Sequence, residues 1–325
     1  MKYDVITFGS ASLDVFLKTT DAVIRPEKKF INRQAVCFPF AAKVEIKNLY
    51  FSSGGGGTNV AASLALQGLK TAYCGKIGKD FSGEEVLKDL NKFKIETPFI
   101  IKTEEKATNL SVIFSWERER TCFVWRGASE FLRWSEIPRE KLEAKWFYLA
   151  PLSGRLISLF GPLVDFARER GIKVFSNLGN SQIKLEKRKL QPILKKIDVV
   201  LLNQEEASLL TGIPYQKEKE LFRRLDEMID GLAIMTKGKE GAIVSDGIYS
   251  WSAKTLPAKV VEKTGAGDAF GAGFLSKLLI GEGPDAALQF GIANSVGCLK
   301  KLGAKNGLLK KNMPWPKVKV VKKKL

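Results

Sequence analysis

The sequence predicts an α/β fold in which a doubly wound, mainly parallel sheet is flanked by helices. From Trp146 onward, short apolar runs of strand length alternate with helical stretches, which is typical of parallel sheets covered on both faces. Two strand-like runs, 110–116 and 120–126, interrupt this alternation and predict a small antiparallel addition. At 325 residues the chain can bury a full core, and its length allows either one large domain with an insertion or two domains; we expect one domain, 1–325, with this addition as the insertion.

The composition narrows the class of protein. Hydrophobic residues make up 45% of the chain and charged residues 27%, as in globular proteins. No apolar run reaches the roughly 20 residues that cross a membrane, so no membrane association is expected. The strand pattern begins at once, without a signal peptide, and the four cysteines lack CxxC spacing. These features predict free thiols and a cytoplasmic location.

The chain has no histidine and a formal charge of +18. Without histidine, Ser–His–Asp and Cys–His mechanisms and His-ligated metal sites are excluded, so a base near neutral pH would be a carboxylate, lysine, tyrosine or thiol. The charge alone would favour a nucleic-acid partner. However, lysine and arginine are spread along the chain and are densest in 317–325. We therefore expect a solvated basic surface with a frayed basic tail, which attracts anionic substrates, and no nucleic-acid partner.

The N-terminal part contains a buried strand and a glycine-rich turn. The strand 5–8 is followed by Asp14, which either caps the next turn or faces a ligand crevice. Four consecutive glycines, 54–57, then precede Thr58, Asn59 and an Ala-rich helix. Glycines let a backbone approach a ligand closely, and a helix cap directly after them disfavours a flexible linker. A strand at 71–75 and a helix at 83–91 follow.

The hairpin 110–126, with its charged turn Glu117-Arg118-Glu119, is predicted to belong to a small antiparallel lid. We assign to this lid the segments 15–51 and 97–127, of which 21–48 is loop and edge strand. A sheet that covers a cleft leaves one face partly apolar, so its aromatic residues are expected to serve a dimer contact as well.

The second half reads as regular α/β alternation. Predicted strands are 146–149, 173–176, 199–202, 232–236, 242–245 and 248–252. Predicted helices are 159–170, 185–196, 205–211 and 218–230.

Two strand ends in this half carry polar residues. Asn203 and Glu206 follow the strand 199–202, and they either form a helix capping box or face phosphates and Mg²⁺. Thr236-Lys237-Gly238 and Gly241 form a turn whose amides suit nucleotide phosphates. No GxxxxGK[ST] motif occurs, so a P-loop NTPase is excluded.

A run of small residues near the C-terminus is the strongest chemical signal. Val260-Val261 is predicted to end a strand, Gly265-Ala266-Gly267 to form a tight turn, and 268–279 a helix. Amide groups at a helix N-terminus bind anions. Asp268 in the first helical turn either stabilises the helix or accepts a proton beside that anion site, as phosphoryl transfer to a hydroxyl requires. Gly271 and Gly273 imply close approach of the helix to the sheet or to a ligand.

These motifs resemble those of the ribokinase-like (PfkB) family of carbohydrate kinases over essentially the whole chain. The first matching element is Gly54-Gly55-Gly56-Gly57-Thr58-Asn59, followed by Gly68 and Gly78, and the second is Gly265-Ala266-Gly267-Asp268 followed by Ala269-Phe270. Asn203-x-x-Glu206 and Thr236-Lys237-Gly238 match as well. Together, in this order, the elements are specific.

The resemblance implies a role for each matching residue. Asp268 would be the base, and Gly265, Ala266 and Gly267 the anion hole for the transferred phosphoryl group. The sugar hydroxyls would be held by Asp14, Gly54, Gly55 and Asn59. The nucleotide would be bound by Asn203, Thr236, Lys237, Gly238, Gly241 and Asn294, the last near the adenine, and Glu206 would be tied to Mg²⁺ through water. The cofactors would be ATP and Mg²⁺, and the lid would pair two subunits in a homodimer.

One motif departs from the family. Relatives usually carry Asp-Thr before the Thr-Gly-Ala-Gly-Asp element, and that Asp helps to bind an activating potassium ion, whereas this chain has Glu262-Lys263. The monovalent cation is therefore left open, with Lys263 as a possible replacement for its charge.

The leading hypothesis is an ATP-dependent kinase acting on a hydroxyl of a small sugar. A nucleoside kinase would use the same Asp and Asn, with a base stacked on lid aromatics such as Trp116 or Trp125, so the residues do not separate the two. A non-catalytic sugar- or nucleic-acid-binding protein is the third alternative, disfavoured because Asp268 and its turn are intact.

Overall fold

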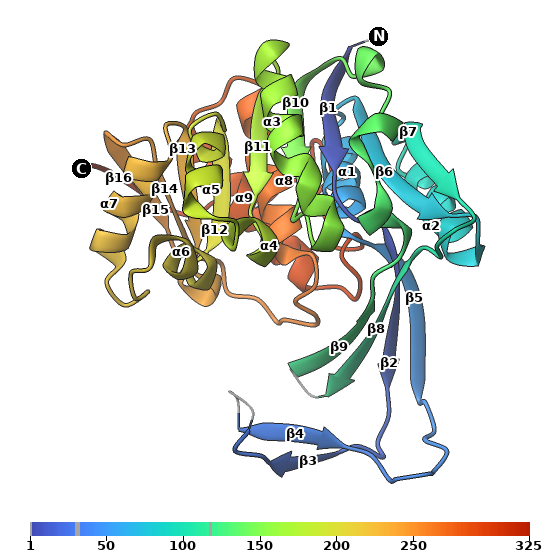
Figure 1. Cartoon of the computed structure of the whole chain (residues 1–325). Coiled ribbons are helices and arrows are strands. Elements are labelled where there is room, and N and C mark those ends of the chain that lie inside the picture. The colour runs from blue at the N-terminus through green and yellow to red at the C-terminus, as the bar shows by residue number, and fades with distance from the viewer. Residues whose placement is uncertain (1, 30–32, 117–118) are drawn as a thin grey trace.

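The computed structural model describes residues 2–29, 33–116 and 119–325 and contains a large sheet between two helical layers, with a small sheet projecting from one end (Figure 1). The large sheet has ten strands in the order β16-β15-β14-β13-β12-β11-β10-β1-β6-β7. In chain order these strands are β1 (Tyr3–Phe8), β6 (Thr71–Gly78), β7 (Glu96–Thr103), β10 (Ala144–Leu149), β11 (Lys173–Asn177), β12 (Val199–Asn203), β13 (Leu232–Thr236), β14 (Ala242–Ser245), β15 (Tyr249–Ala253) and β16 (Val320–Lys324).

The strands from β7 to β13 pair in parallel, and β13 to β16 continue the sheet antiparallel. The central strands are apolar at successive positions because both their faces are covered, and every residue of β6 is buried. The predicted fold class, a mainly parallel doubly wound sheet with a small antiparallel addition, is confirmed.

Helices cover both faces of the sheet (Figure 1). One core cluster packs under α3 (Phe160–Glu169), α5 (Lys187–Leu194), α6 (Gln204–Thr211) and α7 (Glu218–Met228). The opposite face carries α1 (Gly56–Leu66), α2 (Phe81–Lys92), α8 (Ala266–Leu279) and α9 (Pro284–Leu299). Shorter elements are α4 (Asn180–Ile183), η1 (Ala128–Phe131), η2 (Trp134–Glu136), η3 (Arg139–Lys141), η4 (Gly154–Leu159) and η5 (Gly238–Glu240).

The glycines of α8 allow close packing, as the sequence suggested. A Cβ at Gly271 would lie 2.1 Å from the hydroxyl of Tyr148 on β10, and one at Gly273 would lie 3.1 Å from the Cβ of Asn294 on α9. α8 is therefore pressed against both the sheet and α9, which sets the position of its N-terminus.

The small sheet has the order β5-β2-β8-β9 and is made of β2 (Ser12–Lys18), β5 (Asn48–Gly54), β8 (Asn109–Trp116) and β9 (Glu119–Trp125). A separate hairpin, β3 (Val23–Pro26) and β4 (Gln34–Cys37), lies at its far end (Figure 1). The predicted hairpin is therefore present as β8–β9, while Glu117 and Arg118 of its turn, and the side chain of Trp116, lie outside the described residues. The segment assigned to the lid from 97 begins too early, because β7 pairs with β6 in the large sheet.

Two other expectations are wrong. Val260 and Val261 form no strand, because the backbone N–H of Val261 bonds the carbonyl of Leu299 at the end of α9 at 2.8 Å. The tail 317–325 is not frayed: β16 pairs with β15, and the ammonium of Lys322 lies 4.1 Å from the centre of the Tyr249 ring. An exposed basic strand on a sheet edge also discourages pairing with another chain.

Among the described residues, no helix is long and apolar enough to cross a membrane.

Candidate active site

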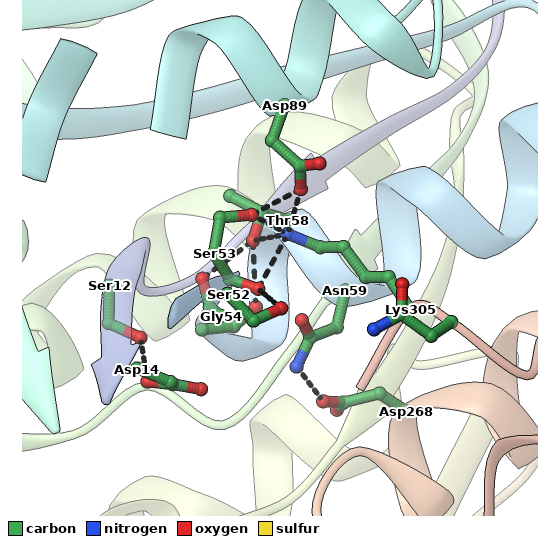
Figure 2. Close-up of polar contacts among 12 residues, drawn as sticks. Ser12, Asp14, Ser52, Ser53, Gly54, Thr58, Asn59, Asp89, Asp268 and Lys305 are labelled. Carbon is green, nitrogen blue, oxygen red and sulfur yellow. Dashed lines mark hydrogen bonds and ion pairs between the residues drawn. The ribbon is translucent and has the colours of Figure 1, made fainter. Parts of the chain in front are cut away.

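The two small-residue turns meet at the N-termini of α1 and α8. The side-chain amide of Asn59, in the first turns of α1, donates a hydrogen bond from Nδ2 to Oδ2 of Asp268 at 2.9 Å (Figure 2). These residues are 209 positions apart in the chain. The fold therefore joins the two motifs that the sequence singled out separately.

Asp268 is a carboxylate poised to exchange a proton near neutral pH. Burial raises the pKa of Asp268 to about 6, against the opposing effects of the Asn59 hydrogen bond and the positive charge of Lys305. The neighbouring Asp14 raises it further. A general base works best when its pKa lies near the working pH, so Asp268 suits that role.

Asn59 has a buried acceptor with no partner. The residue is 5% exposed, and its Oδ1 makes no hydrogen bond with any described group. Leaving a buried polar atom unsatisfied costs about 1–3 kcal/mol. A ligand hydroxyl that donates to Oδ1 would remove this cost beside the Asp268 carboxylate.

Asp14 on β2 lies against the glycine-rich turn. Ser12 Oγ donates to its Oδ1 at 2.9 Å, and burial raises the pKa of Asp14 (Figure 2). A Cβ at Gly54 would lie 1.9 Å from Asp14 Oδ2, so only glycine fits there. Gly55 is the N-cap of α1, with φ 94°. The predicted substrate residues are thus brought together at one place.

The turn before α8 has the geometry of an anion site. Gly265 is the N-cap of α8 and lies in the left-handed region, with φ 79°. A Cβ atom at Gly265 would lie only 2.4 Å from the Cβ of Ala304. Ala266 and Gly267, the first residues of α8, line a pocket of ≈ 660 Å³. Amides at a helix N-terminus favour anionic groups.

The same pocket contains part of the predicted nucleotide site. Thr236, Gly238 and Gly241 lie on its wall, and the remainder is largely apolar. Its volume is typical of sites for small ligands. The apolar lining includes Leu256, Pro257, Ala258, Phe270, Ile292 and Val296.

Four predicted nucleotide or metal residues do not line this pocket: Asn203, Glu206, Lys237 and Asn294. Asn203 Oδ1 accepts the N–H of Glu206, and Glu206 Oε2 accepts the N–H of Asn203, both at 2.8 Å, which is the capping box that the sequence left open. Burial raises the pKa of Glu206. Lys237 forms an ion pair with Glu218 at 2.7 Å.

Asn294, which the resemblance placed near the adenine, does not itself line the pocket. Asn294 is completely buried, its Nδ2 donates to Ser63 Oγ and the Ala269 carbonyl, and its Oδ1 accepts the N–H of Leu309. Its hydrogen-bonding groups therefore join α9 to its neighbours. The adjacent Ser295 lines the pocket instead.

Sequence reasoning missed two cations. Arg120 on β9 contacts the carboxylate of Glu262 and the hydroxyl of Thr264, directly before the anion-site turn. Arg120 of the small sheet thus places a positive charge beside Glu262. Lys305 is buried next to the glycine-rich turn (Figure 2). Neither residue stands in a recognisable local motif, so only their distant acidic partners reveal them.

Comparison with known proteins gives a consistent picture. The sequence matches the family described as pfkB family carbohydrate kinase over residues 14–311. It is 28% identical to a ribokinase of Haemophilus influenzae over 272 residues, which covers 81% of this chain and 86% of that protein. It is also 28% identical to a cytidine kinase of Thermococcus kodakarensis over 253 residues, covering 77% and 88%. The structure of Arabidopsis thaliana ribokinase complexed with ribose and ATP superimposes with a TM-score of 0.76 at 21% identity, over 95% of this chain and 96% of that one.

Proposed function

Since the chain belongs to the PfkB family of carbohydrate kinases, we propose that it transfers the γ-phosphoryl group of ATP to a hydroxyl of a small sugar. The observation that carries this proposal is the Asn59–Asp268 pair. It combines a carboxylate whose pKa is about 6 with an unpartnered buried acceptor at the N-termini of two helices.

In this proposal the acceptor hydroxyl lies between Asn59 and Asp268. Asp268 takes the hydroxyl proton as the oxygen attacks the phosphorus, and Asn59 holds the carboxylate in place through Nδ2. Asp14, fixed by Ser12, accepts hydrogen bonds from further hydroxyls. The turn of Gly265, Ala266 and Gly267 stabilises the charge on the transferred group.

We assign ATP to the pocket of ≈ 660 Å³. The apolar side chains of its wall would bind the adenine, and the amides of the α8 N-terminus would bind the phosphates. Mg²⁺ would be carried by the phosphates and water, since the described residues contain no cluster of three acidic, cysteine or histidine side chains. Glu206 is the carboxylate that we assign to Mg²⁺. It would interact with the ion through water and would keep its capping bond to Asn203. The ion would neutralise phosphate charge.

A nucleoside kinase is the second candidate. The cytidine kinase and the ribokinase are equally similar to this chain, at 28% identity. Trp125 on β9 is 57% exposed and offers a ring on which a base could stack. A nucleoside acceptor would present the same sugar hydroxyls to Asp14 and Asn59.

We also propose that the small sheet acts as a lid and as the contact between two subunits. Large apolar side chains on both edge strands are exposed: Leu49, Tyr50, Phe51, Phe123, Val124 and Trp125. A second copy would cover part of this surface. Light scattering should give about twice the 36.0 kDa chain mass, and Phe123→Lys should shift it to the monomer; a monomeric parent protein would refute the dimer.

The four cysteines are all free thiols. This is the state expected in a reducing compartment, and we propose a cytoplasmic location on that ground.

The proposed reaction is tested by measuring ADP release from MgATP across pentoses, hexoses, keto-deoxy acids and nucleosides, with Asp268→Asn alongside. We expect turnover on one class, reduced at least about a thousandfold by the substitution. Turnover unaffected by Asp268→Asn would refute the base, and no turnover on any acceptor would favour a binding protein.

A further inference from the structure

Lys305 crosses from the C-terminal loop into the interior beside the glycine-rich turn (Figure 2). The residue is 4% exposed, and its Nζ donates to the carbonyl of Ser53 at 3.2 Å, to Thr58 Oγ1 at 3.1 Å and to Asp89 Oδ2 at 3.1 Å. It also contacts the Ser53 hydroxyl. These acceptors belong to β5, α1 and α2, so one ammonium group joins three elements around the turn.

The acceptors of Lys305 in turn hold the backbone of the glycines. Thr58 Oγ1 donates to the carbonyl of Gly54 at 2.7 Å and to that of Gly55 at 3.1 Å. Gly54 packs against Asp14, and Asn59 follows Thr58 directly. The position of Nζ is therefore linked, through one hydroxyl, to the residues proposed to hold the acceptor.

The backbone of the same loop touches the anion-site turn. Ala304 packs on Gly265 so closely that glycine is required there. Cys298 Sγ donates to the carbonyls of both Thr264 and Ala304, at 3.5 and 3.4 Å. Residues 304 and 305 thus contact the phosphoryl side through the main chain and the acceptor side through the lysine side chain.

Stability alone gives little reason for a lysine at this place. Ion pairs taken out of water are often replaceable by apolar residues without loss of stability, because desolvation offsets the attraction, and in Lys305–Asp89 the lysine is buried while the carboxylate is partly exposed. Burial lowers the pKa of Lys305, against the opposing charge of Asp89. Lys305 is thus a buried charged group near the carboxylates of Asp14 and Asp268, and its presence there is better explained by chemistry than by stability.

We propose that Lys305 is a positioning residue for phosphoryl transfer, which fixes the glycine-rich turn relative to the anion-site turn and supplies a buried positive charge within electrostatic reach of the Asp268 carboxylate. This inference rests on the proposed kinase function and deepens it.

The charge of Lys305 has a defined effect on the base. Lys305 lowers the pKa of Asp268, whereas burial and Asp14 raise it. The other groups facing Asp268 are the Asn59 amide and two buried protonated groups, the Tyr148 phenol and the Cys298 thiol, whose pKa values are raised by burial. Glu262 acts on Asp14 and Cys298, and is itself paired with Arg120. Removing the lysine charge therefore takes away one of the influences that lower the pKa of Asp268, and this pKa should rise further.

The test compares three variants by their pH profiles and by ¹³C NMR titration of the Asp268 carboxyl, which needs no substrate. Lys305→Met removes both hydrogen bonds and charge, and Lys305→Gln keeps a donor but no charge. Lys305→Met with Asp89→Asn removes the pair together and so leaves no unpaired buried charge. Lys301→Met, which removes an exposed lysine from the same region, is the matched control.

We expect all three variants to move the Asp268 midpoint, and the acid limb of kcat/KM, upward by about one pH unit. The turnover at pH 7 should fall about tenfold in Lys305→Gln and further in Lys305→Met, while Lys301→Met behaves like the parent protein. Folded Lys305 variants whose Asp268 midpoint stays within about 0.2 unit of the parent would overturn the proposal. Because the titration needs no turnover, that result differs from failure of the kinase function, which would be an inactive parent.

Discussion

The proposed acceptor side and the proposed nucleotide side of the site are built in different ways. On the acceptor side, Asn59 and Asp268 are bonded to each other at 2.9 Å, Asp14 is held by Ser12, and a buried lysine ties the turn together. On the nucleotide side, Asn203 and Glu206 bond each other, Lys237 pairs with Glu218, and Asn294 is completely buried. What remains there is a pocket of amides and apolar side chains.

The difference fits the chemistry proposed for each side. Proton transfer needs a carboxylate with a tuned pKa, which requires burial and specific charged neighbours. Nucleotide binding is served by shape, apolar surface and main-chain amides, none of which needs a particular side chain. Substitutions should therefore be severe on the acceptor side and mild at the polar residues of the nucleotide side.

The largest effect is expected for Asn59→Leu, a replacement of similar volume. It removes the donor to Asp268 and the unpartnered Oδ1, so kcat/KM for the acceptor should fall about a hundredfold or more. The dissociation constant for ADP, measured by calorimetry, should change less than about twofold. Asn91→Leu, at an exposed position on α2, is the control. An equal loss of ADP affinity would contradict the separation of the two sides.

The pH profile tests the acceptor side without a mutation. Asp268 acts as a base only when deprotonated, and its pKa is raised to about 6. Activity should therefore be complete above that pH and fall about tenfold per unit below it, as the carboxylate takes up a proton. Steady-state kcat/KM between pH 5 and 8 measures this. A flat profile across this range would mean that another group limits the reaction.

Arg120→Met tests whether the small sheet contributes to the turn before α8. It leaves the carboxylate of Glu262, which is 6% exposed, without its cation, and loosens the contact to Thr264. We expect kcat to fall about tenfold with a smaller change in the KM for ATP.

The matched control for Arg120→Met is Arg126→Met. Arg126 follows the same strand, but its ion-pair partner is Glu130, at 3.4 Å, whereas that of Arg120 is Glu262. If both variants lose activity equally, the loss comes from a general change in the lid and not from the contact of Arg120 with Glu262 and Thr264.

The smallest effect is expected at Glu206. Glutamine can also close a capping box, so Glu206→Gln should change kcat/KM and the Mg²⁺ dependence by less than about twofold. Glu206→Ala should lower the free energy of unfolding by about 1 kcal/mol, measured in urea. Glu205→Gln, at the exposed neighbouring position, is the control. If Glu206→Gln raised the Mg²⁺ requirement tenfold, the carboxylate charge would matter and the nucleotide side would resemble the acceptor side.

The fold class, the order of most strands and helices, and the turn before α8 were predictable because each rests on local patterns. Alternating apolar runs marked β10 to β15, and small residues before an apolar helix marked Gly265 to Asp268. α9 was not predicted, because it is buried on several sides and lacks a one-sided apolar period. β7 was assigned to the wrong sheet, and β16 was taken for a disordered tail, because strand pairing depends on distant partners.

The sequence by itself singled out the small-residue turns and carboxylates to which we assign the proposed chemistry, since tight turns, helix starts and the absence of histidine are properties of short segments and of composition. The tertiary structure alone decided their protonation and their partners. The pKa of Asp268, the bond from Asn59, the Arg120–Glu262 pair and the crossing of Lys305 to Asp89 join residues up to 216 positions apart. Burial and electrostatic interaction act through space, and no local pattern of residues encodes them.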